Sequence, residues 1–516
     1  MAEDGQRGLH IQIIHIKINK PVKSLNNFFV NLNYMQIIDV INEVLWSYVM
    51  IAMLLLWAIY FTVATGGVQF RMIGEMCRLL VRSAQPDDPD GRRQTDDDTA
   101  DAGNRKHKRG DKPKKEVSSF QAFAMSIASR VGTGNLAGVA TAIALGGPGA
   151  VMWMWIIALL GSANAFIEST LAQLFKVKGK DSFQGGPAYY IQMGIGKRWW
   201  AVLFAILITV TFGLAFNSVQ SNTIAESLKA FNVDSTVTGV VLMVMTLMVI
   251  CGGITRISRF SEVVVPIMAV AYILLALVVL IFNIDEFPRV ISEIVENAFN
   301  FRAGLGGGVG AALMMGIKRG LFSNEAGEGS APNVAATATV SHPVKQGLIQ
   351  TLSVFTDTLV ICTCTAFIIL LNGAPDSGLS GIALTQNALD IELGMNLGSI
   401  FVATAIFFFA FTSIVANYYY GETNIQFITP RRWVVWLYRI IVAGMVLVGA
   451  VSTLDFVWAL ADITMACMTI CNLVAIAVLG RYAIILLNDY RSQLRNGRDP
   501  VYHSSKLPKL NTPCWD

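Results

Sequence analysis

The stretch that decides the fold is Ser126-Ile-Ala-Ser-Arg-Val-Gly-Thr-Gly-Asn-Leu-Ala-Gly-Val-Ala-Thr141. It lies among long apolar runs but is a poor continuous helix, because Gly132, Gly134 and Gly138 lower its helix propensity. Non-helical backbone is tolerated inside a bilayer only where protein buries it or where it lines a cavity. Such broken helices are typical of transporters, whose half-helix ends and free carbonyls bind a solute and a cation. We therefore expect a binding site here.

The composition is that of a protein embedded in lipid. The chain has 516 residues, of which 54% are hydrophobic and 14% charged, and its mean hydropathy is +0.53. Soluble chains are roughly 25% charged, and about 20 apolar residues suffice to cross a bilayer. Several runs reach that length, so we expect an integral membrane protein with many spans. The net charge of +4 is small, and we expect no nucleic-acid partner.

Charge and hydropathy divide the chain before its core begins. We expect a polar segment at 1–43, an extra transmembrane helix at 44–66 and a charged loop at 67–117, disordered over the apolar-poor stretch 85–111. Because basic clusters mark cytoplasmic loops, this loop is predicted to be cytoplasmic. That orientation puts the N-terminus outside and the C-terminus in the cytoplasm.

The rest of the chain contains ten further predicted spans in two halves, 118–282 and 298–480, followed by a cytoplasmic tail at 481–516. Glycines interrupt the first span of each half, the second time at 304–310. Interrupted helices in corresponding positions indicate an inverted repeat with its site near the middle of the membrane. Five spans in each half require that the two halves be inverted. The total is about 11 helices in an all-α membrane protein.

Four motifs resemble the alanine/glycine:cation symporter family. They are Val131-Gly-Thr-Gly-Asn-Leu-Ala-Gly138, Gly146-Gly-Pro-Gly-Ala150, Gly185-Gly-Pro187 with Tyr189-Tyr190, and Arg319-Gly-Leu-Phe-Ser-Asn-Glu-Ala-Gly327. The resemblance covers about 45–480 and implies the LeuT-type five-plus-five inverted repeat of the amino acid–polyamine–cation superfamily. It also implies a secondary active symporter of the plasma (inner) membrane that imports alanine or glycine with Na⁺ by alternating access. The long charged stretch 85–111 departs from the family pattern.

Other functions remain open at this point or are disfavoured. H⁺ can replace Na⁺ as the coupling ion for the same or another small amino acid, and a transport-silent amino acid sensor can keep the same scaffold. An enzyme is not expected, because membrane acyl-transfer or redox chemistry usually needs a buried histidine or a metal cluster. All histidines lie in predicted polar segments (His10, His15, His107, His342, His503). We expect no cofactor beyond Na⁺ as coupling ion.

The resemblance implies a Na⁺ site between the first and eighth core helices. The backbone carbonyls of Ala128 and Val131 and the hydroxyls of Thr412 and Ser413 are its expected ligands. Na⁺ is a hard ion, and neutral oxygens from two helices suit its reversible binding. The alternative is that the two hydroxyls bond only to the backbone of their own helix.

The resemblance also implies a substrate site at the first break. The amides of Thr133 and Gly134 are expected to face the substrate carboxylate, with Asn135 beside them, and Gln220 is expected to bond the same ligand. The small residues Gly306 and Gly307 leave room for a small side chain. The alternatives are close helix packing for the glycines and a bond between helices for Gln220.

Ionisable residues inside membrane segments are candidate functional residues by default. Arg130 is expected to attract a carboxylate or to pair with Glu168. Asp357 and Asp462 are candidate proton or cation relays, or ordinary helix-pairing groups. The loop after the sixth core helix carries two acids that we assign to an inner gate or loop network (Glu325, Glu328).

Overall fold

A computed structural model describes residues 37–84, 117–179, 182–252, 254–299, 308–373, 377–394 and 396–515. The stretch 85–111, which we expected to be disordered, lies outside these residues. So do Gly306 and Gly307, which we expected near the substrate. The described chain is helical apart from one antiparallel pair, β1 (Val177–Lys178) and β2 (Phe183–Gln184), in which Val177 lies opposite Gln184.

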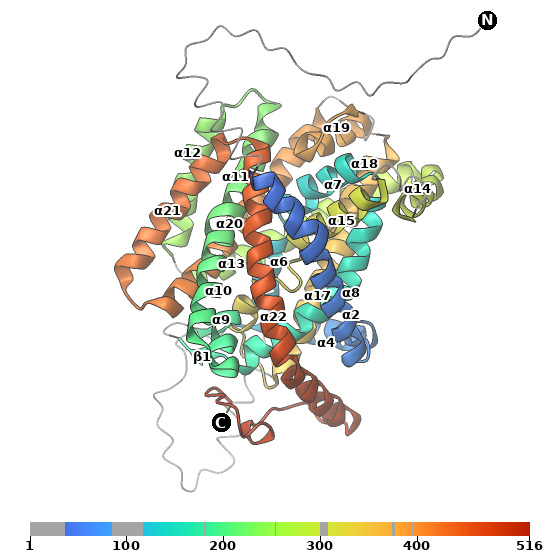
Figure 1. Ribbon diagram of the computed structural model, residues 1–516. Coiled ribbons are helices and arrows are strands. Elements are labelled where there is room, and N and C mark those ends of the chain that lie inside the picture. The colour runs from blue at the N-terminus through green and yellow to red at the C-terminus, as the bar shows by residue number, and fades with distance from the viewer. Residues whose placement is uncertain are drawn as a thin grey trace, which may run out of the picture.

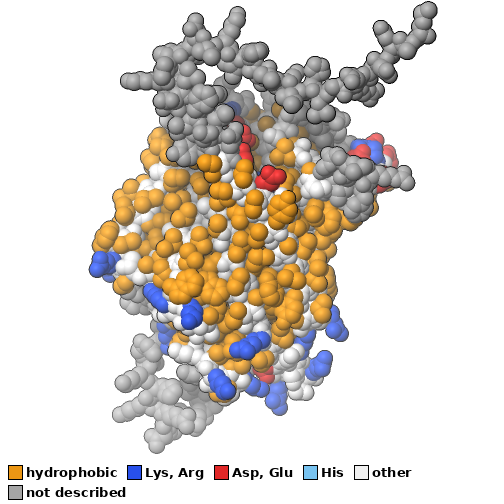
Figure 2. All heavy atoms as spheres, in the orientation of Figure 1, with side chains coloured by type: hydrophobic (Ala, Val, Ile, Leu, Met, Phe, Trp, Pro, Cys, Tyr) orange, Lys and Arg blue, Asp and Glu red, His pale blue; other side chains and the backbone are white. Residues whose placement is uncertain are grey.

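The described residues include eight helices that are long and apolar enough to cross a membrane: Ile37–Ala64, Gly149–Leu174, Arg198–Lys229, Val263–Phe282, Pro343–Leu371, Leu397–Ile428, Arg432–Val451 and Leu454–Arg495. Two shorter apolar helices accompany them, Gly134–Gly146 and Ser235–Ile250. Figure 2 shows apolar side chains in a broad band across one face, with Lys and Arg gathered toward one end of the molecule. The protein is therefore a multi-pass membrane protein, whereas the count of about 11 helices stays a prediction.

The first core helix is interrupted at the expected place. Helix α6 (Ser119–Arg130) begins in a capping box, in which Ser118 Oγ accepts from Gln121 N at 3.1 Å and Gln121 Oε1 accepts from Ser118 N at 3.2 Å. After the break, η2 (Gly134–Gly138) continues into α7 (Val139–Gly146). The helices that follow in this half are α8 (Gly149–Leu174), α10 (Arg198–Val210), η4 (Thr211–Phe216), α11 (Asn217–Lys229), α12 (Ser235–Ile250) and α13 (Ile254–Phe282).

The second half repeats this order, and most of the break that we expected at 304–310 lies outside the described residues. Helix α15 (Gly308–Asn324) is continuous through Gly310, and its interruption comes after Asn324, before the short α16 (Pro332–Ala335). The glycines at 308 and 310 are therefore helical. The helices that follow are α17 (Pro343–Val354), η7 (Phe355–Cys362), α18 (Thr363–Leu371), α20 (Leu397–Ile428), α21 (Arg432–Val451) and α22 (Leu454–Arg495).

Short helices occupy connections that looked like loops in the sequence. The acidic stretch 283–297 contains η5 (Ile284–Glu286) and most of α14 (Phe287–Phe299), which buries Val290, Ile294 and Ala298 on one face. The other short helices are α3 (Val68–Arg71), α4 (Ile73–Ser83), α9 (Pro187–Tyr190), η3 (Ile191–Ile195), α19 (Gly381–Leu393) and η9 (Ser504–Lys506). The span Ile37–Ala64 itself contains η1 (Leu45–Met50) and α2 (Ile51–Ala64).

The two interrupted helices lie inside the bundle. Helix α8 packs against α15 and α17, and α20 packs against α6, α11 and α13. Helices α12 and α21 lie side by side at one edge (Figure 1). Helix α2 lies outside on α8 and α22. Trp46 Nε1, which precedes α2, donates to Asp462 O near the start of the long α22, and Tyr490 OH near the end of α22 donates to Glu75 Oε1 of α4, which follows α2. Helices α2 and α22 therefore run in the same direction.

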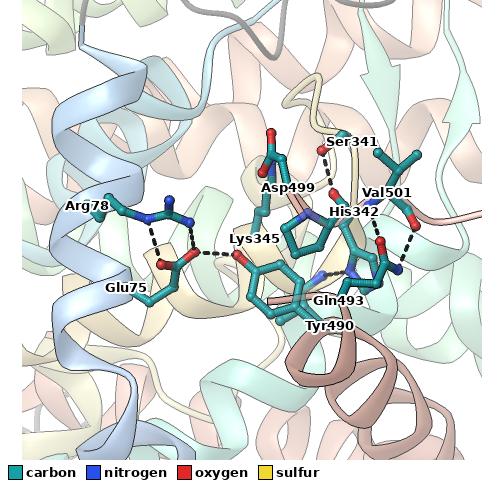
Figure 3. A network of polar contacts seen from close by, with 11 residues as sticks. Glu75, Arg78, Ser341, His342, Lys345, Tyr490, Gln493, Asp499 and Val501 are labelled. Carbon is teal, nitrogen blue, oxygen red and sulfur yellow. Dashed lines mark hydrogen bonds and ion pairs between the residues drawn. The ribbon is translucent and has the colours of Figure 1, made fainter. Parts of the chain in front are cut away.

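The C-terminal chain folds back onto the end of the bundle. Tyr502 N donates to Ser341 O at 2.9 Å, and the Trp515 indole donates to Gln173 O at 2.9 Å. Lys345 forms an ion pair with Asp499 at 3.0 Å. Lys345 and Asp499 belong to a polar network that joins α4, α17, α22 and the C-terminal chain (Figure 3). The last residues of the described chain are thus part of the folded structure.

Candidate functional site

The break in the first core helix leaves backbone groups that side chains satisfy. Val131 adopts an extended conformation after α6, and the following amides cannot complete a regular helix. Gly132 N donates to Asn135 Oδ1 at 3.0 Å, and Thr133 N donates to Gln220 Oε1 at 2.9 Å. The structure therefore brings Gln220 of α11 to the break, and whether it also contacts a substrate stays a prediction. The carboxylate of a ligand is also a hydrogen-bond acceptor and could take the place of either of these two amide oxygens.

Gly132 allows three helices to meet at this point. A Cβ atom on Gly132 would lie 2.4 Å from Ser413 Oγ and 2.8 Å from Gln220 Oε1. Any side chain here would separate α6 from α11 and α20. Close approach, rather than conformational freedom alone, explains this glycine.

Oxygen atoms converge between α6 and α20. Ser413 Oγ lies 2.9 Å from Ala128 O, 3.3 Å from Val131 O and 2.9 Å from Phe409 O. A hydroxyl has one hydrogen to donate, so it cannot donate fully to three carbonyls at once. The carbonyl oxygens around Ser413 Oγ are therefore not all satisfied by it, and the four residues are fully buried. Such a cluster of neutral oxygens is suited to a hard cation.

Thr412 is placed differently from Ser413. Its Oγ1 donates to Phe409 O at 2.8 Å, within its own helix. Of the four residues that we expected to bind Na⁺, the structure joins Ala128, Val131 and Ser413 through direct contacts. It connects Thr412 to them through the shared carbonyl of Phe409.

The second break is buried rather than exposed in a loop. The residues between α15 and α16 are all buried, and positive φ angles occur at Glu325 (54°), Gly327 (94°) and Gly329 (86°). Gly327 N and Gly329 N each donate to a carboxylate oxygen of Glu168 at 3.1 Å. Asn472 Nδ2 donates to the same carboxylate at 2.8 Å. Glu168 thus provides the acceptors that this unwound backbone needs.

The two breaks are in direct contact. Ser129 Oγ lies 2.6 Å from Glu325 Oε1, and a Cβ atom on Gly134 would lie 3.0 Å from Ser323 Cα. Asp357 of η7 joins them, because its carboxylate accepts from Asn135 Nδ2 at 2.7 Å and from Ser323 Oγ at 2.8 Å. Asn135 therefore serves the break as both acceptor and donor.

Three aromatic side chains beside the breaks were not expected from the sequence. The ring of Phe322 lies 4.4 Å from that of Phe216 and 4.7 Å from that of Trp458, measured between centroids. A Cβ atom on Gly134 would lie 3.1 Å from Phe322 Cδ1. Apolar residues are frequent throughout the spans, so no sequence signal distinguishes these three. Asn417, a buried polar residue of α20 whose Oδ1 lies 2.9 Å from Ser129 Oγ, was not predicted either.

Comparison with known proteins identifies the family of this chain. A family model described as "Sodium:alanine symporter family" matches residues 31–96 and 98–504. The chain belongs to this family. One relative, from Bacillus subtilis (strain 168), is the "Probable sodium/glutamine symporter GlnT", which is 48% identical over 93% of this chain and 95% of its own length. Another from the same organism is the "Amino-acid carrier protein AlsT", which is 49% identical over 93% of this chain and 97% of its own length. These relatives are transporters, and this family member is a transporter rather than an enzyme.

A solved structure supports the same architecture. MhsT in complex with L-phenylalanine aligns with a TM-score of 0.54 at 14% identity, over 73% of this chain and 99% of that one. At this identity the likeness shows the fold alone. The expected LeuT-type fold is confirmed for this member of the sodium:alanine symporter family.

The buried charges of this sodium:alanine symporter family member do not form the expected ion pair. The Arg130 guanidinium donates to Ser353 Oγ, and its Nε and Nη2 atoms have no hydrogen-bond partner among the described residues. Glu168, the expected partner of Arg130, bonds to backbone instead. Both carboxylate oxygens of Glu328 are buried and likewise lack a hydrogen-bond partner in the described chain. These groups are the unsatisfied part of the site.

Asp462 lies in a different environment. Its carboxylate forms ion pairs with Lys318 at 2.7 Å and Arg319 at 2.9 Å, and all three side chains are largely buried. This pairing matches the structural alternative that we considered for Asp462. Asp357, by contrast, lies between the two breaks.

Proposed function

We propose that this chain is a secondary active symporter that imports a small neutral amino acid, alanine or glycine, coupled to Na⁺ by alternating access. The observation that carries the proposal is the oxygen cluster of Ala128, Val131, Phe409 and Ser413 next to the amides of Thr133 and Gly134. A cation bound there lies one or two residues from the amides that bind a carboxylate. Each ligand therefore favours binding of the other.

The proposed Na⁺ ligands are the carbonyls of Ala128 and Val131 and the hydroxyls of Thr412 and Ser413. When Na⁺ binds, the Ser413 hydroxyl keeps its hydrogen but turns it away from the cluster, and its oxygen then presents a lone pair to the ion. For Thr412 this requires that its hydroxyl oxygen turn a lone pair toward α6 while it keeps its bond to Phe409 O. The ion fixes the distance between α6 and α20, which belong to different parts of the bundle.

The proposed substrate site uses the amides of Thr133 and Gly134 together with Gln220, Asn135 and, beyond the described residues, Gly306 and Gly307. The substrate carboxylate displaces Gln220 Oε1 from Thr133 N, and the carboxamide then turns to the ligand. The close contact of Gly134 with Phe322 and Ser323 leaves little room and supports a small side chain. The name of GlnT makes glutamine the rival substrate to test.

We further propose that the N-terminus lies outside and the C-terminus in the cytoplasm of a plasma (inner) membrane. The Lys and Arg side chains of Figure 2 gather toward the end that carries the C-terminal chain. Basic residues are retained on the cytoplasmic side of membrane proteins, which supports this orientation.

Coupling to H⁺ is the second candidate, and Glu328 is the observation that favours it. A fully buried carboxylate without hydrogen-bond partners is stabilised when it takes up a proton. Glu325, whose carboxylate accepts from Ser129 and Ser330, is its neighbour along the chain. A sensor that binds the amino acid without net transport is the third possibility.

One experiment separates these functions. Purified protein in proteoliposomes is given labelled alanine, glycine or glutamine under an inward Na⁺ gradient, with a matched K⁺ gradient and a pH gradient as controls. Accumulation of alanine or glycine that requires Na⁺ supports the proposal. Accumulation under the pH gradient alone selects H⁺, accumulation of glutamine alone overturns the substrate assignment, and binding without accumulation selects the sensor.

A further inference from the structure

A cavity outside the transport site opens where α2 and α3 meet the end of α22. It has a volume of about 260 Å³ and is lined by Arg71, Met72, Arg491, Leu494 and Arg495. Arg71 ends α3, directly after the turn that follows α2, and the other two arginines lie in the last turns of α22. The fold thus brings three guanidinium groups from two ends of the sequence to one cavity.

These guanidinium groups have no counter-ion in the described part of the chain. None of the three forms an ion pair or a hydrogen bond with a described residue, and Arg491 Nη2 is buried without a partner. A Cβ atom on Gly66 would lie 3.7 Å from Arg71 Nη1 and 3.8 Å from Arg491 Nη1, so both groups border the same point of the backbone. Like charges held this close repel one another unless an anion lies between them.

The carboxylates nearest to the cavity along the chain bind other cations (Figure 3). Glu75 accepts from Arg78 at 2.6 and 2.7 Å and from Tyr490 at 2.6 Å. Asp489, two residues before Arg491, is paired with Lys506 at 2.9 Å. Asp499 is paired with Lys345. Positive charge is therefore in excess at the cavity.

Apolar side chains are exposed beside these arginines. Val63 near the end of α2 is 74% exposed, and Phe70, next to Arg71, is 46% exposed. On α22, Ile485 is also exposed, on the side of Arg491 that leads into the span. In a bilayer such side chains contact acyl chains. Arginines at helix ends often extend into water, but the buried Nη2 of Arg491 is not solvated in that way.

We propose that the cavity binds the phosphate group of an anionic phospholipid, whose acyl chains run along the exposed side chains of α2 and α22. Arginine guanidinium groups bind phosphate oxygens through two parallel hydrogen bonds, and basic pockets between transmembrane helices bind anionic headgroups. A phospholipid fits better than a free phosphate ion, because the charged cavity and the apolar surface adjoin. The bound lipid fastens the extra helix α2 to α22.

The test is lipid binding by the full-length transporter, measured by native mass spectrometry after titration with phosphatidylglycerol or phosphatidylcholine. We expect the wild type to retain phosphatidylglycerol selectively. A basic residue near a membrane surface contributes about 1 kcal/mol to the binding of anionic lipid, so each lost arginine should weaken binding roughly fivefold. The double variant Arg71→Gln/Arg491→Gln should therefore lose most of the selectivity.

Two further variants keep the test decisive. Arg481→Gln removes an exposed charge from the same helix outside the cavity, and it should bind phosphatidylglycerol like the wild type. If the double variant does not fold, Arg495→Gln changes an exposed side chain of the cavity and should still weaken binding about fivefold. Equal retention of phosphatidylglycerol by wild type and cavity variants overturns the proposal. The proposal is also overturned if the wild type retains phosphatidylcholine as well as it retains phosphatidylglycerol. If millimolar inorganic phosphate displaces phosphatidylglycerol, the cavity binds a free anion instead.

Discussion

At Gly132 a hydrogen atom in place of a side chain lets α6, α11 and α20 approach closely. Ser413 Oγ and Gln220 Oε1 lie only 2.4 and 2.8 Å from the place where a Cβ atom would be. The proposed cation site and the amides proposed to bind substrate are therefore neighbours for a steric reason. A change in either of these two side chains should consequently affect one ligand directly and the other through coupling.

We expect Ser413→Ala to raise the Na⁺ concentration for half-maximal uptake by about tenfold or more, because loss of a polar partner inside a protein costs roughly 1–3 kcal/mol. Thr412→Ala should have a smaller effect, since the Thr412 hydroxyl is already bonded within its own helix. The control is Thr404→Ala, which removes an exposed hydroxyl with the same kind of helix bond, to Ile400 O at 2.8 Å. An unchanged Na⁺ dependence in Ser413→Ala would contradict the proposed site.

Gln220→Glu tests the substrate site at the same scale. The new carboxylate accepts from Thr133 N as Gln220 does, but it competes more strongly with the carboxylate of the substrate. We expect the KM for the amino acid to rise at least about tenfold, given that hydrogen bonds to charged groups are worth about 1.5–3 kcal/mol. The Na⁺ dependence should shift less. The measurement is initial uptake at saturating Na⁺, and an unchanged KM would remove Gln220 from the site.

At the scale of the element, the two interrupted helices differ in what supports them. Side-chain oxygens of Asn135 and Gln220 hold the amides of the first break. The second break relies on the carboxylate of Glu168 and on glycines with positive φ. Glu168 is therefore a support for the second unwound segment, and the pairing with Arg130 that we expected is not formed.

Gly329→Ala should destabilise the protein and lower transport. The φ of Gly329 is +86°, and a Cβ atom there would lie 2.7 Å from Pro187 Cγ and 2.8 Å from Asn472 Cγ. The left-handed conformation alone costs an alanine about 1–2 kcal/mol, and the contacts add to it. Gly394→Ala is the matched control, because its φ is +68° with no atom within 4 Å of the added Cβ. Thermal melting followed by size-exclusion chromatography compares the two, and equal shifts would show that crowding is unimportant at Gly329.

At the scale of the whole molecule, the C-terminal chain closes one end of the bundle. It contacts the ends of α8 and α17, and α22 is joined to α4 through Tyr490 and Glu75. His342, the N-cap of α17, lies at the centre of these contacts (Figure 3). Its Nδ1 accepts from Val344 N at 3.2 Å, and its Nε2 lies 3.5 Å from Asp489 Oδ2.

Burial lowers the pKa of His342, although Asp489 partly offsets that effect and Lys345 and Lys506 add to it. The unfolded chain binds a proton near pH 6.5, and the folded protein binds it only at lower pH. Because the unfolded chain takes up this proton more readily, acidification lowers the free energy of unfolding. The folded protein keeps its full stability above about pH 6.5 and loses part of it as the pH falls toward the folded pKa. We expect the melting temperature to fall with acidification over that range. His342→Asn keeps an N-cap acceptor and should weaken the dependence; an identical pH profile in wild type and variant would contradict the prediction.

The sequence by itself determined the membrane class and the interrupted first core helix. These depend on local properties: apolar length, glycine content and the order of motifs. The LeuT-type fold followed from motifs at Val131–Gly138 and 319–327, and the family match supports it. Gln220 and Ser413 were proposed because the family resemblance places them at the substrate and Na⁺ sites.

Only the tertiary structure decided that the chain also unwinds after Asn324 and what supports that segment. In the sequence, Asn324–Pro332 looks like a polar loop. Only the folded chain shows that this segment is buried and that the carboxylate of Glu168 accepts hydrogen bonds from its amides. Likewise, only the folded chain brings Phe216, Phe322 and Trp458 together, and only the folded chain brings Arg71, Arg491 and Arg495 to one cavity. Composition records which groups are present, but whether a polar group is solvated or buried, and beside which partner, depends on contacts between residues far apart in the chain.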